Sequence, residues 1–408
     1  MDMLTMKPTG IGLGDLSKPF PFLLPTRIEF GPGAADRVAD EAIVFGTRAL
    51  VVSDPGVERV GLVAAVLARL ELAGLDVKTF TGIEANPRVA TVDDVGRVAR
   101  DHEADVIVAI GGGSAIDSAK AASAVARYGG TILDYEGLDH VPGPGIPVVA
   151  IPTTAGTGSE VTLWAIVTDT TRQFKAPIGS FHLAPKVALV DPLTTLTLPA
   201  ALTASTGIDA LTHAIEAYTA RCSNPISDAL VLYAIELISI YLERATSRGN
   251  DVEARSAMML GSLLAGIGFG NADTAAVHSM AEALGAVFDV AHGTANAIFL
   301  PVVMAHNAPA ALERTARIGS AMGLDTSGLS LGAAAAAAVA AVRDLTSRLG
   351  IPSLADVGIT DADLPKLAMT AMMNTGTPDN PVEMDEASFL ELFSSTLHGG
   401  DEATTARN

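Results

Sequence analysis

The sequence has little cysteine, few aromatic residues and few basic ones. Of its 408 residues one is cysteine, Cys222, which excludes an internal disulfide and suits a reducing compartment such as the cytoplasm. The 26 Lys+Arg against 46 Asp+Glu give a formal charge of −20, so no basic face for nucleic-acid phosphates is expected. Because 49% of residues are hydrophobic, the chain is long and apolar enough for a sizeable core in two or more domains.

Long uninterrupted apolar runs are also missing. The N-terminal stretch MDMLTMKPTGIGLGDLSKPF lacks the continuous apolar core of a signal peptide. The run LGAAAAAAVAAV, residues 331–342, is too short to cross a bilayer. We therefore expect no membrane partner, and we expect residues 401–408 to form a disordered tail.

The first 190 or so residues alternate between strand-like and helix-like segments. Apolar strand patterns at 48–54, 105–114 and 146–160 each run into small residues, and helical patterns at 60–74 and 94–104 lie between them. Strands separated by helices in this way indicate right-handed crossovers and a parallel sheet.

The character of the sequence changes near DPLTTLTLPAAL, residues 191–202. Beyond it the dominant patterns are helical, at 203–220, 226–246, 251–268, 272–286 and 331–349. The prediction is an α/β domain with a parallel, dinucleotide-binding sheet over 1–194, followed by an all-helical metal-binding domain over 195–400.

Two glycine-containing loops follow strands of the predicted sheet. IGGGSAIDSAK, residues 110–120, opens a helix, where exposed N–H groups can bind a phosphate, although its spacing is not G-x-G-x-x-G. The alternative is a tight turn with Ser114 as the N-cap of the helix. A second small-residue loop, PTTAGTGSE at 152–160, favours the first interpretation, because two such loops at the carboxyl ends of parallel strands form a nucleotide-binding crevice.

Histidines and a carboxylate recur in apolar helical segments. Asp209 and His213, in TGIDALTHAIEAY, are four residues apart and share a helix face, and His278 and His292 lie in AVHSMAEALGAVFDVAHGTANAI. Taken singly, each is explained by a surface hydrogen bond or a buried carbonyl partner. Together, one carboxylate and three imidazoles suit Fe²⁺ or Zn²⁺ better than Ca²⁺ or Mg²⁺.

These four motifs together resemble the iron-containing (group III) alcohol dehydrogenase family, over nearly the whole chain. The resemblance implies a two-domain enzyme that transfers a hydride between NAD(H) and a small alcohol, aldehyde or ketone, with its active site between the domains. It implies that Fe²⁺, or Zn²⁺ or another divalent ion, is held by Asp209, His213, His278 and His292. It also implies a homodimer or a higher homo-oligomer.

The resemblance further implies a set of cofactor-binding residues. Asp54 matches a residue near the adenosine ribose, where a carboxylate would repel a 2′-phosphate and favour NAD over NADP. Asp117 would orient the nicotinamide side. The whole implied set is Asp54, Asn86, Gly112, Gly113, Ser114, Asp117, Thr153, Thr154, Ser159, Thr162 and Lys175.

The chain departs from the family pattern at Glu282, where many relatives have a histidine close to the substrate. Glu282 is expected to act as a proton relay, to add a metal ligand or to contact a polar or cationic part of the substrate; the alternative is a solvated helix residue. Trp164 and Phe269 match pocket positions and suggest a narrow, apolar pocket, with core packing as the alternative for both.

Three other functions stay open at this point. A glycerol or polyol dehydrogenase that uses zinc is the nearest, and a non-catalytic NAD-binding relative is another. A lyase with the dehydroquinate synthase architecture is disfavoured, because the metal motifs contain no Lys or Arg for a phosphorylated substrate.

Overall fold

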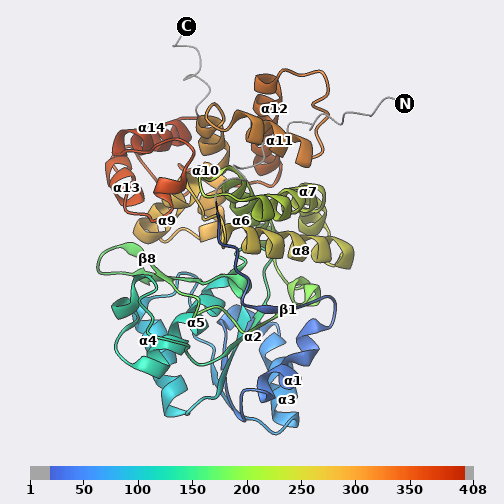
Figure 1. The fold of residues 1–408 in the computed structure, drawn as a ribbon, viewed down its shortest axis with the longest axis vertical. Helices are drawn as coiled ribbons and strands as arrows, with labels where there is room; N and C mark the ends of the chain where they lie inside the picture. Colours follow the sequence, from blue (N-terminus) through green and yellow to red (C-terminus); the bar gives the residue numbers. More distant parts are fainter. Residues whose placement is uncertain (1–18, 400–408) are drawn as a thin grey trace.

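The computed structural model describes residues 19–399, and in it the strands and the later helices occupy opposite halves of the molecule (Figure 1). All strands lie in the first half of the chain, up to Val190, and from Ala200 onward the described chain is helical. The predicted fold class is therefore confirmed. The N-terminal stretch 1–18 and the predicted tail 401–408 lie outside the described residues.

The larger sheet has six strands that are all parallel. Their order is β1 (Arg27–Phe30), β9 (Val187–Val190), β6 (Val148–Pro152), β4 (Val106–Gly111), β2 (Arg48–Val52) and β3 (Asp76–Phe80). Both central strands β4 and β6 are buried along their whole length, which explains why their sequences are apolar without alternation.

Helices cover both faces of this sheet. On one face α4 (Val89–Asp101) and α5 (Gly113–Tyr128) pack on alternate strand residues such as Leu50 and Ile107. On the other face α1 (Val38–Ile43) and α3 (Leu62–Leu72) pack on the neighbouring residues, such as Val51 and Val108. The short helix α2 (Pro55–Arg59) follows β2.

A second, three-stranded sheet was not predicted. In it β7 (Trp164–Asp169) pairs antiparallel with β8 (Phe174–Gly179), and β8 pairs parallel with β5 (Gly137–Leu138). The interpretation of this half as a single parallel sheet was therefore incomplete. Gln173, with a φ of 51°, lies in the tight turn that lets the chain reverse between β7 and β8 without a helix.

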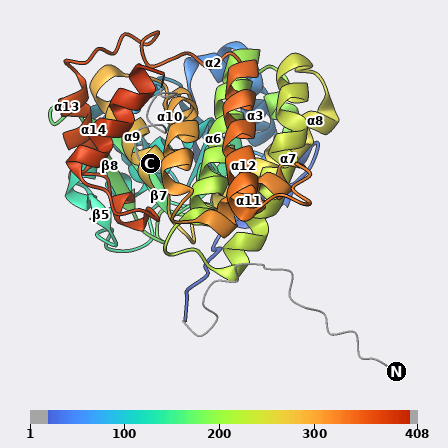
Figure 2. The same ribbon diagram turned by 90° about the horizontal axis from the view of Figure 1, so that it is seen from above.

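The helical half contains nine α-helices between Ala200 and Leu397. The five predicted helical patterns correspond to α6 (Ala200–Thr219), α7 (Pro225–Ser247), α8 (Val252–Phe269), α9 (Ala276–Phe288) and α12 (Leu331–Arg348). Four further helices were not predicted, namely α10 (His292–Asn307), α11 (Leu312–Ala321), α13 (Leu364–Ala371) and α14 (Glu386–Leu397). Figure 2 shows α6 inside this bundle, where α7, α8 and α10 all contact it.

The predicted division at residues 194/195 falls within a short 3₁₀ turn, Pro192–Thr195, just before α6. The two halves are in close contact where Gly158 meets Gly266 of α8. A Cβ atom on Gly158 would lie 2.4 Å from Gly266 Cα, so both positions need glycine, and Gly158 also has a φ of +60°. The division into two domains at this boundary remains a prediction.

Among the described residues, α7 is the one helix long and apolar enough to cross a membrane. Length and composition alone are weak evidence for a membrane span, because the core helix of a globular protein passes the same test. Of the most apolar 18-residue stretch of α7, 44% is buried inside the molecule, and the helix packs on α6 and α8.

Candidate active site

The two small-residue loops lie side by side at the carboxyl ends of β4 and β6. A Cβ atom on Gly113 would lie 2.9 Å from Thr157 Oγ1, and one on Gly112 would lie 3.3 Å from Thr154 Cγ2. Side chains at these glycines would collide with the threonines, so the two loops pack closely there. A cavity lined by Gly112, Gly113, Thr153 and Thr154 runs along them, in the place of the crevice that the sequence predicted.

The helix that follows the first loop starts without a side-chain cap. Gly112 is the N-cap residue of α5, and no side chain accepts a hydrogen bond from its first turn. Ser114 instead donates from Oγ to the carbonyl oxygen of Ala85, at 2.5 Å, so the alternative prediction of Ser114 as N-cap is wrong. An uncapped helix start facing a crevice is suited to binding an anion such as a diphosphate.

Asp54 stands at the rim of the same crevice and caps α2. Its Oδ1 accepts hydrogen bonds from the backbone N–H groups of Gly56, at 2.8 Å, and Val57, at 3.0 Å. Its Oδ2 faces Gly111, where a Cβ atom would lie 3.2 Å away. The carboxylate is thus held by one oxygen, and its second oxygen has no hydrogen-bond partner among the described residues.

A buried ion pair orients Asp117 beneath the loops. Asp117 Oδ1 accepts from Ser159 Oγ at 2.5 Å, and its Oδ2 accepts from the Ile166 N–H at 3.1 Å. Lys120 Nζ lies 3.1 Å from Asp117 Oδ1 and donates to Ser159 Oγ at 2.8 Å and to Thr162 Oγ1 at 3.3 Å. Burial lowers the pKa of Lys120, and the Asp117 charge opposes that shift. Sequence reasoning missed Lys120, although its place one turn after Asp117 was a usable signal.

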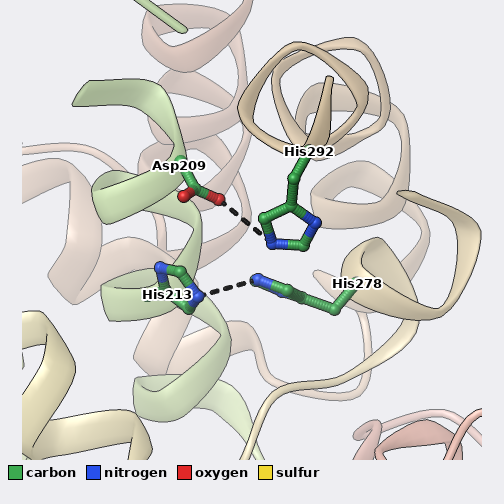
Figure 3. A group of neighbouring side chains, drawn as sticks. All are labelled: Asp209, His213, His278 and His292. Carbon is green, nitrogen blue, oxygen red and sulfur yellow. Dashed lines mark hydrogen bonds and ion pairs between the residues drawn. The ribbon is translucent and has the colours of Figure 1, made fainter. Parts of the chain in front are cut away.

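Asp209, His213, His278 and His292 converge on one point from three helices (Figure 3). One ligand atom from each lies within 4.8 Å of all the others. His213 Nε2 is 3.0 Å from His278 Nε2, and His292 Nε2 is 3.6 Å from Asp209 Oδ1. Because α6 supplies the first two one turn apart, the predicted same-face spacing is what brings them together.

The cluster suits a divalent transition metal by its chemistry. Burial lowers the pKa of His213 to about 3, and burial lowers the pKa of His278 and of His292 to about 4, so all three rings are neutral and offer a lone pair. One donor, Asn296 Nδ2, lies 2.6 Å from Asp209 Oδ1 and 3.1 Å from Nε2 of both His278 and His292. The lone pairs of three imidazoles and one carboxylate therefore converge, with one hydrogen-bond donor between them, and such a group of side chains suits a shared cation.

Two residues next to this cluster were missed by sequence reasoning. Glu216 accepts a hydrogen bond from His278 Nδ1 at 2.5 Å, and burial raises the pKa of its carboxyl to about 7. Asn296 lies four residues after His292 on α10. Both stand one helical turn from a predicted ligand, so helix spacing was a signal for each.

Glu282 lines the cavity beside the cluster but is not among its four converging ligand atoms. Its Oε2 accepts a hydrogen bond from Asn374 Nδ2 at 2.5 Å, so the residue is not simply solvated. Burial raises the pKa of Glu282 to about 7, while the positive charge of Lys175 opposes the shift. The partner Asn374 comes from an irregular segment between α13 and α14, which carried no sequence signal.

Lys175 and Asn86 form the far wall of this cavity. Lys175 Nζ donates to Asn86 Oδ1 at 2.5 Å, and Asn86 Nδ2 donates to Asp289 Oδ1 at 2.6 Å. Burial lowers the pKa of Lys175 to about 8. This chain of contacts joins β8 to the segment that leads into His292.

Trp164 and Phe269 line the cavity, as predicted from their positions. The Phe269 ring is stacked on the His213 ring, with centroids 4.2 Å apart and an angle of 16° between the planes. The Trp164 ring packs against Gly179 of the paired strand β8, where a Cβ atom would lie 2.3 Å from its Cζ3. Each ring therefore also contributes packing, the alternative role expected for it.

Every predicted site residue lines at least one of two adjoining cavities, and three of them, Gly113, Ser114 and His292, line both. The cavity along the glycine loops is lined by Asp54, Gly112, Thr153, Thr154 and Asp209. The cavity that reaches the histidines is lined by Asn86, Asp117, Ser159, Thr162, Trp164, Lys175, His213, Phe269, His278 and Glu282.

A parallel sheet with an uncapped helix start, next to a largely buried His₃Asp cluster, is the arrangement expected of a metal-dependent, dinucleotide-using enzyme. Comparison with known families agrees. Residues 25–192 match the family "Iron-containing alcohol dehydrogenase", and residues 203–397 match "Fe-containing alcohol dehydrogenase family, C-terminal". The chain belongs to the iron-containing alcohol dehydrogenase family.

Individual relatives match over their whole length. The 1,3-propanediol dehydrogenase of Citrobacter freundii is 40% identical over 378 residues, which cover 92% of this chain and 98% of that protein. The NAD-dependent methanol dehydrogenase of Bacillus methanolicus is also 40% identical, covering 92% of this chain and 99% of that protein. The crystal structure of a 1,3-propanediol oxidoreductase superimposes with a TM-score of 0.90 at 39% identity, covering 93% of this chain and 100% of that chain.

Proposed function

We propose that this protein is an NAD(H)- and metal-dependent alcohol dehydrogenase that interconverts a small alcohol and its aldehyde or ketone. One observation carries the proposal: the cluster of buried Asp209, His213 and His278 with the partly exposed His292, and the start of α5, open into adjoining cavities that share His292. Hydride transfer requires the nicotinamide of the cofactor and the reacting carbon of the substrate to be in contact, and adjoining cavities allow that contact.

The loop cavity is assigned to the dinucleotide. The diphosphate would lie at the uncapped start of α5, against Gly112, Gly113 and Ser114. Asp54, with Oδ1 engaged in capping, would accept from a ribose hydroxyl through Oδ2. Asp117 is held rigid by Ser159 and Lys120, and it would orient the nicotinamide end of the cofactor.

The four converging side chains are assigned to the metal. Asp209, His213, His278 and His292 would hold Fe²⁺, or Zn²⁺ in its place. When bound, the ion would supply a Lewis acid that favours the deprotonated alcohol or polarises the carbonyl oxygen. The protein's own part is to present three neutral imidazoles and one carboxylate from an apolar helical core.

Glu282 is assigned the role of proton relay. It lies one helical turn after His278, lines the reactive cavity and is held by Asn374. As a carboxylate it would accept the proton released in alcohol oxidation, and as a carboxylic acid it would return that proton in carbonyl reduction. The competing role, contact with a polar or cationic substrate group, predicts a change in substrate preference and no change in the pH profile.

The substrate pocket is proposed to be narrow. Trp164 and Phe269 approach the cavity from different halves of the molecule, and both rings are held by packing, on Gly179 and on His213. Rigid aromatic walls favour short, slender alcohols, because a wider substrate would have to displace them.

The experiment that tests the proposal is an assay of NADH formation. Purified protein is loaded anaerobically with Fe²⁺ or Zn²⁺ and offered methanol, ethanol, 1-propanol, 1,2-propanediol, 1,3-propanediol, glycerol and choline. The proposal expects turnover with at least one short alcohol and faster reduction of the matching aldehyde at neutral pH. NAD binding without turnover, in protein shown to hold its metal, would instead support a non-catalytic NAD-binding protein.

We further propose a cytoplasmic homo-oligomer. The single thiol, Cys222, supports the compartment, and an exposed apolar face supports self-association. On α7 the side chains of Ile226, Tyr233 and Ile240 are 45%, 48% and 58% exposed and recur every seven residues, so they share one face. Light scattering tests the assembly, since a monomer at micromolar concentration would contradict it, and cell fractionation tests the compartment.

A further inference from the structure

Helix α9, which carries His278 two residues after its start, has no cap of its own. Its N-cap residue is Ala275, which has no side chain able to accept a hydrogen bond, and its backbone is extended there, with φ −146° and ψ −146°. The first N–H groups of a helix need partners when they are buried, and Ala276 and Val277 are both buried. These partners come from elsewhere in the chain.

Glu216 of α6 supplies the cap from a distance of 61 residues in sequence. Its Oε1 accepts from the Val277 N–H at 2.7 Å, and its Oε2 accepts from His278 Nδ1 at 2.5 Å. The residue is 2% exposed. One carboxylate therefore holds the start of α9 with one oxygen and the metal-facing imidazole with the other.

This arrangement fixes the tautomer of His278. Because Nδ1 carries the proton donated to Glu216, Nε2 carries the lone pair, and Nε2 is the atom that lies 3.0 Å from His213 Nε2 inside the cluster. His213 differs, because its buried Nδ1 has no hydrogen-bond partner among the described residues and its ring is held by stacking on Phe269.

We propose that Glu216 is a positioning residue for the metal centre, which locks His278 and caps α9 at the same time. The inference rests on the proposed metal function of the cluster. Three of the groups that build the centre then lie on one helix, because α6 provides the ligands Asp209 and His213 and also Glu216, which orients His278. Carboxylate partners of this kind commonly change metal affinity by about 10–100-fold.

The test is Glu216→Gln, which keeps the size of the side chain but leaves one acceptor oxygen for two donors. Zn²⁺ and Co²⁺ affinities are measured by competition with a chromophoric chelator, and the visible spectrum of the Co²⁺ form reports the ligand geometry. We expect metal affinity to fall about 10–100-fold and the Co²⁺ spectrum to change. NAD affinity, measured by calorimetry, should stay within about twofold, because Glu216 lines neither cavity.

The matched control is Glu41→Gln. Glu41 is also a buried glutamate, 5% exposed and paired with Arg27 and Arg37, but it lies in α1 outside both cavities. It should lower stability without changing metal affinity. A second control repeats Glu216→Gln in a His278→Ala background, which is expected to hold no metal; there the substitution should still lower thermal stability, because the hydrogen bond from the Val277 N–H is weakened in either background.

Each outcome has one meaning. Equal metal affinity in wild type and Glu216→Gln overturns the inference while leaving the proposed function intact, and a wild type that binds no metal overturns the proposed function itself. If Glu216→Gln does not fold, Glu216→Asp keeps both oxygens on a shorter side chain. A folded Glu216→Asp with weakened metal binding supports the inference, and one with wild-type binding contradicts it.

Discussion

Asn86, which lines the reactive cavity, donates a hydrogen bond from Nδ2 to Asp289 Oδ1, 2.6 Å away, and accepts one from Lys175 Nζ. Asp289 has a left-handed backbone, with φ 57°, at the end of α9, and it stands three residues before the metal-site residue His292. This contact ties the sheet-containing half of the molecule to the segment that positions His292.

Replacing Asn86 should therefore weaken catalysis without removing the metal. Asn86→Ala loses hydrogen bonds to charged groups, worth about 1.5–3 kcal/mol, so kcat/KM is expected to fall about 10–100-fold. Asn86→Asp should lower kcat/KM further than Asn86→Ala, because it places a second carboxylate next to that of Asp289. Steady-state kinetics with metal analysis checks this, and a variant with wild-type kcat/KM would show that the contact is dispensable.

Cofactor choice should depend on Asp54. The test is Asp54→Ser, because serine is a good N-cap and preserves the start of α2 while it removes the charge. We expect wild type to prefer NAD(H) over NADP(H) and the variant to narrow that preference, chiefly through a lower KM for NADP(H). Equal catalytic efficiency of wild type with both cofactors would rule the assignment out.

The relay role of Glu282 predicts a change in the pH profile. Burial raises the pKa of Glu282 to about 7. Because alcohol oxidation needs the carboxylate, its rate should increase as pH rises through this pKa, which gives the pH–rate profile a rising limb. A bound cation would move this limb to lower pH. Glu282→Gln keeps the shape and should lower kcat by about 10²–10⁴-fold and flatten that limb. Glu282→His should retain more activity than Glu282→Gln.

Two results for Glu282 would be decisive against the relay. A Glu282→Gln variant that is kinetically silent at every pH would leave the residue only a structural role through Asn374. A variant that loses its metal would make Glu282 a ligand, although its oxygens are not among the converging ligand atoms.

The width of the substrate pocket should depend on Trp164. Trp164→Ala removes one aromatic wall of the pocket. The kcat/KM for longer alcohols should therefore rise relative to that for ethanol, by up to about fourfold for each added methylene group that becomes buried. Trp164→Phe is the control and should stay close to wild type. Unchanged ratios of kcat/KM across a series of primary alcohols would mean that Trp164 only packs on Gly179.

Half of the metal cluster was predictable from helix periodicity, whereas His278 and His292, which lie on the separate helices α9 and α10, were added from their chemistry and the family resemblance. Asp209 and His213 lie four apart in an apolar helix, and burying titratable groups without a shared partner would be costly. The glycine loops were predictable because each follows a buried strand. The spacing of Asp209 and His213 and the strand–loop patterns are local in sequence, so no knowledge of tertiary contacts was needed to read them.

Other features depend on contacts between distant segments and were not predictable in this way. The Glu216 carboxylate reaches α9 across 61 residues, and Asn374 reaches Glu282 from a segment without regular structure. The antiparallel pair β7–β8 was missed because short buried strands look alike in parallel and antiparallel sheets. The alternative role of Ser114 as an N-cap rested on propensity, whereas a tertiary hydrogen bond to Ala85 occupies its hydroxyl group.

Metal dependence of turnover tests the central claim most directly. The wild type is stripped with a chelator and titrated anaerobically with Fe²⁺ or Zn²⁺, while bound metal and NADH formation from a short alcohol are measured together. The account predicts that activity rises in proportion to bound metal and saturates at one ion per chain, and that His278→Ala neither binds that ion nor turns over although it still binds NAD. Turnover by stripped protein, or by His278→Ala with its metal content unchanged, would contradict the account.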